Sequence, residues 1–141
     1  MKKFLDSKLF AVLLAMVGCV LLYRMSTNNP PLRGAAVMAF IESDLEAVLK
    51  NGGKVIDHSS RVNLHSVHRT VRFMDEGWSA ALRERDIATL QELGWVRRAP
   101  KVLCKRGAQL TIGEGGSMYR GQGTNSLFFM YDRGSVKACA A

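Results

Sequence analysis

The chain has 141 residues, of which 48% are hydrophobic and 23% are charged. This length leaves room for one hydrophobic core, and this composition excludes a disordered chain. The net charge of +8 is unevenly placed, because from Trp95 to Ala141 eight basic residues are balanced only by Glu114 and Asp132. The sequence therefore predicts one folded domain with a basic C-terminal part.

The first 25 residues have the pattern of a signal-anchor. Lys2, Lys3 and Lys8 precede fifteen uncharged residues, Leu9 to Tyr23, and Arg24 follows. Basic flanks hold their end of a membrane segment in the cytoplasm and send the following residues across. We expect residues 1–25 to form a cytoplasmic tip and a single transmembrane helix in a bacterial inner membrane, with a periplasmic domain after it.

Two alternatives to a retained anchor remain open. Fifteen helical residues span about 22 Å, which is less than the roughly 30 Å of a hydrocarbon core, so ordinary cleavage is one alternative. The other is lipidation, because Met16-Val17-Gly18-Cys19 resembles the lipobox of bacterial lipoproteins. Lipidation would remove residues 1–18 and tether the chain through Cys19. Against it, the apolar run continues after Cys19, where lipoproteins usually turn polar.

The rest of the chain divides into a linker and a domain. Residues 26–34 are polar and contain Pro30 and Pro31, so a short stiff linker is expected there. Residues 35–141 then form the domain. Its first element is predicted as an amphipathic helix over 35–50, which ends at Asn51-Gly52-Gly53.

The middle of the domain predicts two strands and a second helix. Short β-branched and alternating runs between Lys54 and Met74 indicate two strands, with a break near residues 58–60. Asp86 is the expected N-cap of a helix over 87–93. Residues 78–85 belong to this helix or form a separate turn before it.

The C-terminal part predicts two hairpins. Strands are expected at 101–105, 109–112, 126–131 and 135–140, with turns at 106–107 and 132–134 and a glycine-rich loop at 113–125. Together these elements predict an α+β domain, with a largely antiparallel sheet and two helices, after the transmembrane helix.

Cys104 and Cys139 are the only cysteines outside the apolar N-terminal segment. In an oxidising compartment two such residues commonly pair. We therefore predict a Cys104–Cys139 disulfide. Since no Cys-x-x-Cys spacing is present, a redox-active role is not expected.

Two other segments contain residue types that occur in ligand-binding sites. His58, His65 and His68 are the only histidines, but His65 and His68 would point to opposite faces of one strand, so no metal site is predicted. The loop 113–125 lacks the spacing of a phosphate-binding loop. It is expected to be a flexible connection, and a binding loop with Tyr119 and Arg120 at its tip is the alternative.

The basic group at the first hairpin is the main candidate binding patch. It consists of Arg97, Arg98, Lys101, Lys105 and Arg106. Lys101 and Lys105 share a strand face opposite Val102 and Cys104, so this face is expected to be exposed. Near a membrane it would meet anionic lipid, a cell-wall polymer or an acidic protein, although such patches are often only solvated faces. An extracytoplasmic position argues against nucleic acid.

No catalytic motif is present, so no enzyme and no cofactor are predicted. The sequence favours a membrane-anchored binding or scaffold protein, an accessory subunit of a cell-envelope assembly with a protein partner. The alternatives are a tethered binder of anionic lipid or polymer, a lipoprotein, and a small metal-dependent enzyme that uses the histidine segment.

Overall fold

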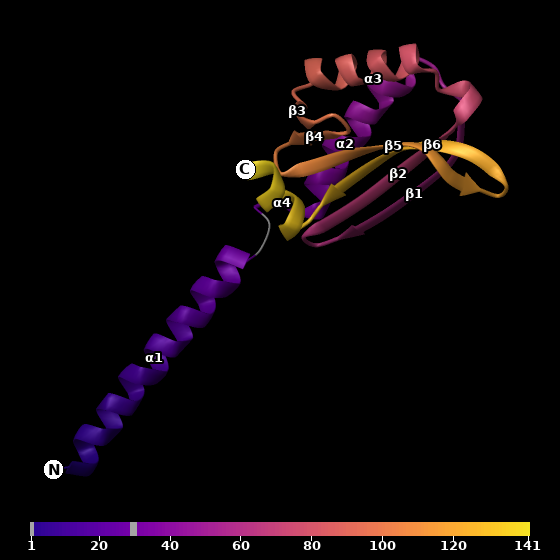
Figure 1. Ribbon diagram of the computed structural model, residues 1–141. Coiled ribbons are helices and arrows are strands. Elements are labelled where there is room, and N and C mark those ends of the chain that lie inside the picture. The colour runs from indigo at the N-terminus through magenta and orange to yellow at the C-terminus, as the bar shows by residue number, and fades with distance from the viewer. Residues whose placement is uncertain (1, 29–30) are drawn as a thin grey trace.

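The computed structural model describes the backbone of residues 2–28 and 31–141 and the side chains of 11–25, 31–115 and 118–141. It contains an N-terminal helix, α1 (Lys2–Asn28), and an α+β domain (Figure 1). Within the described residues the chain has four α-helices and one six-stranded sheet.

Helix α1 is apolar on every side over residues 11–23. Val12, Leu13, Leu14 and Leu22 are each more than half exposed, and at about 100° per residue they point in four different directions around the helix. In the described part of the chain, no helix combines the length and the apolar character needed to cross a membrane. Helix α1 continues through Asn28, and the expected linker residues 29 and 30, including Pro30, lie outside the described residues.

The domain is built on an antiparallel sheet, as the sequence predicted. Along the chain the elements are α2 (Gly34–Leu49), β1 (Val55–Asn63), β2 (Ser66–Met74), the short 3-10 helix η1 (Asp75–Gly77), α3 (Ala80–Glu92), β3 (Val96–Ala99), β4 (Val102–Lys105), β5 (Ala108–Tyr119), β6 (Gln122–Tyr131) and α4 (Arg133–Ala140). The strand order is β1-β2-β6-β5-β4-β3, and every neighbouring pair is antiparallel.

Helices α2 and α3 cover one face of the sheet, as Figure 1 shows. The predicted stripe of α2 is buried, with Val37, Ile41 and Val48 fully shielded from solvent. Alternate residues of β2 and β6, such as Val71 and Phe129, meet this stripe because neighbouring side chains on a strand point to opposite faces. The hydrophobic core therefore lies between α2 and the sheet.

The start of α2 is fixed against the β1–β2 turn. The Gly34 N–H donates a hydrogen bond to the Leu64 carbonyl oxygen at 2.8 Å. A Cβ atom at Gly34 would lie 2.0 Å from the Asn63 carbonyl oxygen, so no other residue fits without movement of the backbone. This contact holds the N-terminal end of the domain beside the turn.

Two boundaries in the middle of the domain differ from the prediction. The break between β1 and β2 lies at Leu64 and His65 instead of residues 58–60, because both strands pair continuously through Ser59 and Ser60. Helix α3 begins after its N-cap Ser79, whose hydroxyl accepts from the Leu82 N–H at 3.2 Å. The predicted cap Asp86 is instead a buried residue inside α3.

The glycine-rich segment is not a loop. Residues 113–119 continue β5, with an irregularity between Gly113 and Ser117, and β6 returns after a turn at Arg120-Gly121. Both turn residues have positive φ, 50° and 79°, which is the geometry of a tight two-residue hairpin. The turn at Arg106-Gly107 has the same geometry, and it lies where the sequence predicted a turn.

The predicted strand 135–140 is the helix α4, so the domain has three helices and not two. Asp132 caps this helix: its carboxylate accepts from the Ser135 N–H at 2.8 Å, and the Ser135 hydroxyl accepts from the Asp132 N–H at 2.9 Å. This reciprocal capping box favours a helix over the expected turn at 132–134.

Candidate functional site

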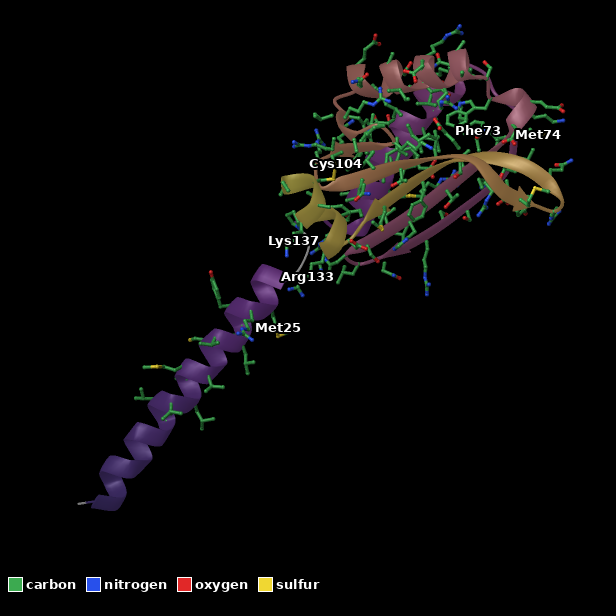
Figure 2. All side chains as sticks on the ribbon, in the orientation of Figure 1. Met25, Phe73, Met74, Cys104, Arg133 and Lys137 are labelled. Carbon is green, nitrogen blue, oxygen red and sulfur yellow. A yellow bond between two sulfur atoms is a disulfide. The ribbon has the colours of Figure 1, made fainter. Side chains whose placement is uncertain are left out.

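Helix α4 is held at one end of the sheet by a disulfide. Cys139 of α4 is bonded to Cys104 of β4, so the pairing expected from the sequence is present (Figure 2). The side chain of Val136 packs over the turn at Gly107, where a Cβ atom would lie 2.9 Å from it. The C-terminal helix is therefore fastened to the β4–β5 hairpin by covalent and apolar contacts.

The five residues of the predicted basic patch do not form one surface. Lys105 is on the core side of β4 with Leu103, which is completely buried. Its ammonium group lies 2.6 Å from the Asp44 carboxylate of α2, and only 14% of its side chain is exposed. The expectation that the shared face of Lys101 and Lys105 is exposed is wrong for Lys105. Residues 101, 103 and 105 alternate onto the same face of the strand. The apolar Leu103 between the two lysines is the sequence signal that this face is buried.

The other members of that group have different surroundings. Lys101 is half exposed, and its ammonium group lies 3.0 Å from the Glu114 carboxylate. Arg97 donates to the Pro100 carbonyl oxygen at 2.7 Å, close to its own strand. Arg98, in contrast, donates to the Cys139 carbonyl oxygen of α4, and Arg106 lies in the turn before Gly107, on which Val136 of α4 packs.

Asp44 is the centre of a buried polar cluster that the sequence reasoning missed. Besides Lys105, it accepts a hydrogen bond from the Trp95 indole N–H at 2.8 Å. The Lys105 ammonium also lies 5.4 Å from the centre of the Phe40 ring. Trp95 and Lys105 both contact the same Asp44 oxygen, Oδ2, so the cluster joins α2 to β4 and the start of β3.

A second buried aspartate repeats this arrangement on α3. Asp86 accepts from the Trp78 indole N–H at 2.7 Å and from the Asn51 side-chain amide at 3.0 Å. Burial raises the pKa of Asp86 above its ordinary value of 3.8, although these two hydrogen bonds and the charge of Arg85 lower it. Both Trp–Asp pairs are internal, so their role is to orient the helices rather than to meet a ligand.

The sheet face opposite α2 carries half-buried side chains. Phe128 and Met130 of β6 lie on this face, because their neighbours Leu127 and Phe129 face the core. The His68 ring of β2 contacts the Phe128 ring, with centroids 6.0 Å apart. Apart from α4 at one end, no helix of the described chain covers this face in Figure 1. We call the side chains of His68, Phe128 and Met130 the open-face strip.

The turn end of the β5–β6 hairpin, opposite α4, contains the other predicted candidates, Tyr119 and Arg120. Arg120 lies at the turn, and its guanidinium group and that of Arg72 each lie 5.3 Å from the centre of the Tyr119 ring. A surface hollow of about 320 Å³ lies nearby, lined by Met74, Asp75, Glu76, Gln122 and Gly123. Two of the lining residues, Asp75 and Glu76, are acidic.

The three histidines are distributed over β1, the β1–β2 turn and β2. His58 is exposed on β1, His65 is in the turn, and His68 belongs to the open-face strip. Among the described residues, no group of three or more potential metal ligands is close enough to hold an ion.

Comparisons of this chain with models of protein families, with curated proteins and with solved structures found no match.

Proposed function

We propose that this protein is a single-pass membrane-anchored binding or scaffold protein whose domain lies outside the cytoplasm, as an accessory subunit of a cell-envelope assembly. The observation that carries the proposal is that α1 is apolar on every side over residues 11–23 and that the domain following it in the chain contains a disulfide. A helix that is apolar on all sides needs an apolar environment, and disulfides persist in oxidising compartments. The basic residues before the apolar segment support an outer position of the domain, because basic flanks are retained in the cytoplasm.

The binding part of the proposal rests on the open-face strip. Half-buried aromatic and methionine side chains on a sheet face without a helix layer are suited to contact with another protein. Such a surface offers shape and apolar contact but no converging catalytic groups. A scaffold or accessory role therefore agrees with it better than the enzyme alternative does.

The first test is the intact mass of the full-length protein isolated from membranes, measured with alkylation before and after reduction. An uncleaved chain with two thiols released only by reduction supports the anchor and the oxidising location. Cleavage before Cys19 with an added lipid would make the protein a lipoprotein instead. Free Cys104 and Cys139 thiols throughout would refute the extracytoplasmic location and reopen a cytoplasmic function for the basic C-terminal part.

The second test compares two apolar-to-acidic substitutions in full-length protein extracted with mild detergent. Phe128→Glu changes the open-face strip, whereas Leu64→Glu changes a residue that is 65% exposed at the β1–β2 turn. We expect Phe128→Glu to lose co-purifying envelope proteins that both wild type and Leu64→Glu retain. Equal retention by both variants would exclude the open-face strip as the scaffold surface.

A further inference from the structure

Five basic side chains surround α4, and only two of them were in the patch predicted from the sequence. They come from four segments that the fold brings together. We call them the α4 basic surface, and all of them are exposed: Arg33, Arg98, Arg106, Arg133 and Lys137.

Two members belong to α4 and one donates a hydrogen bond to it, whereas Arg106 and Arg33 are placed near α4 by the residues next to them in the chain. Arg133 and Lys137 are four residues apart on α4, so they share one face of the helix. Arg98 donates to the Cys139 carbonyl oxygen at 3.4 Å. Arg106 precedes Gly107, on which Val136 packs, and its guanidinium group lies 5.8 Å from the centre of the Phe40 ring.

Arg33 joins the group through the first residues of the domain. The preceding Leu32 N–H donates to the Tyr131 hydroxyl at 2.7 Å, and Tyr131 is directly followed by the cap of α4. The chain therefore enters the domain beside α4. In Figure 2, Arg133 and Lys137 lie on the side of the domain nearest to Met25 of α1.

The charge of this surface is not neutralised inside the domain. Within the described residues, five other basic side chains, including Lys101 and Lys105, form ion pairs, but none of the α4 basic surface does. The acidic residue nearest in sequence to Arg133 and Lys137 is Asp132, and its carboxylate caps α4 by accepting from the Ser135 N–H. The surface thus presents several positive charges without acidic partners.

The short connection to α1 keeps this surface near any membrane that holds α1. Four residue steps separate Asn28, the end of α1, from Leu32, so they lie at most about 14 Å apart. The helical residues from Arg24 to Asn28 add about 6 Å. The attraction of an anionic leaflet for basic side chains acts over a Debye length of about 8 Å, which the α4 basic surface can reach.

We propose that the α4 basic surface docks on the anionic lipid headgroups of the membrane that anchors α1, and so fixes the orientation of the domain. This inference rests on the membrane anchoring in the proposed function. With α4 against the headgroups, Arg120 and the turn that closes the β5–β6 hairpin are directed away from the membrane, since the ten residues of β6 separate its two ends by about 30 Å.

The test uses the full chain reconstituted in vesicles of phosphatidylcholine alone or with about 30% phosphatidylglycerol as the anionic lipid. Backbone hydrogen exchange is measured by mass spectrometry on peptides covering 104–108 and 131–141. We expect exchange to be slowed at least about fivefold in the anionic vesicles, since each basic residue near the surface contributes about that factor. About 0.5 M NaCl should remove the protection, because salt screens the attraction.

The variant Arg133→Glu/Lys137→Glu should abolish the protection. Reversal of two charges lowers the ratio of docked to undocked domain at least about 25-fold. Arg133→Gln/Lys137→Gln removes the two charges without reversing them, and it should give a protection from exchange between that of the wild type and that of the Glu variant. Such a graded loss is not expected if the substitutions simply unfold the domain. The matched control is Lys54→Glu/Arg120→Glu, which changes the net charge equally at the other end of the sheet and should keep the protection.

Flotation of the same samples separates the two proposals. If the chain floats with both vesicles but exchange is equal in both, the docking inference is wrong and the anchor stands. If the wild-type chain floats only with anionic vesicles, and Arg133→Glu/Lys137→Glu floats with neither kind of vesicle, the anchor is wrong and the binding of lipid by the α4 basic surface is supported. If soluble polyglutamate protects these peptides and anionic lipid does not, the surface binds an acidic macromolecule and the lipid inference is wrong. Failure to float with either vesicle overturns both proposals.

Discussion

The ion pair of Lys105 with Asp44 gives the sharpest test of the fold. Substitution Lys105→Met keeps an unbranched apolar side chain but removes the ammonium group 2.6 Å from the Asp44 carboxylate. Only 7% of the Asp44 side chain is exposed, so the carboxylate is left with the Trp95 N–H as its one remaining described hydrogen-bond donor. Removing one partner of a buried pair costs about 3–5 kcal/mol of stability.

The expected loss lies at the lower end of this range. Lys105 is 14% exposed, and some water therefore reaches the pair and weakens it. We expect Lys105→Met to lower the free energy of unfolding by about 3 kcal/mol, which corresponds to a fall of roughly 10–15 °C in Tm for a domain of this size.

The reciprocal change should cost less. Asn at position 44 still accepts from the Trp95 N–H, and the Lys105 ammonium keeps its contact with the Phe40 ring and its access to solvent. We expect Asp44→Asn to cost about 1 kcal/mol. In the double variant Lys105→Met/Asp44→Asn the loss should be smaller than the sum of the two, because no uncompensated charge remains buried.

The assay is urea unfolding of the full chain in detergent micelles with the disulfide intact, followed by near-ultraviolet circular dichroism of the tryptophans. Lys101→Met is the control, because its pair with Glu114 is half exposed and ion pairs at the surface contribute little to stability. The reasoning is refuted if Lys105→Met is no less stable than Lys101→Met, or if the losses of the Lys105 and Asp44 variants simply add.

Three further predictions concern other contacts of the domain. Gly34→Ala should lower the free energy of unfolding by about 2 kcal/mol, because its Cβ meets the Asn63 carbonyl oxygen, whereas Gly18→Ala, with open space around it, should not; urea unfolding of both variants checks this. Replacing both cysteines of the 35-residue disulfide loop with Ala should cost about 4 kcal/mol in the chain-entropy model, and an unchanged urea midpoint would contradict it. Because burial raises the pKa of Asp86, the stability from its protonation is present below 3.8 and is lost as pH rises through the folded-state pKa. Asp86→Asn should remove this decline when unfolding is compared from about pH 3 to pH 7, and an equal decline in both proteins would assign it to other groups.

Local sequence signals were sufficient to predict an element where the residues within that element, or directly next to it, determine its conformation. The apolar stripe and the Asn51-Gly52-Gly53 stop of α2, the turn at Arg106-Gly107 and the antiparallel strands around it depend on nearby residues. The disulfide could also be predicted from the sequence, since Cys104 and Cys139 have no other cysteine to pair with outside the N-terminal segment.

The same signals failed where two readings of a segment compete. Residues 135–140 contain alternating small residues that are compatible with a strand, but the Asp132–Ser135 capping box and the bond to Cys104 favour a helix. The glycines at 113–121 indicated a loop, yet the pairing of β5 with β6 carries an irregular strand through them. Contact with a partner strand decided the second case.

The sequence by itself determined the class of the domain, its one disulfide, its basic C-terminal part and the apolar segment before it, because these depend on composition and on patterns within short windows. The tertiary structure decided which charges are free. It buried Lys105 against Asp44 from a helix 61 residues away in sequence, and it gathered Arg33 and Arg98 around α4. A charge is neutralised or exposed by its neighbours in space, and no local pattern specifies those neighbours.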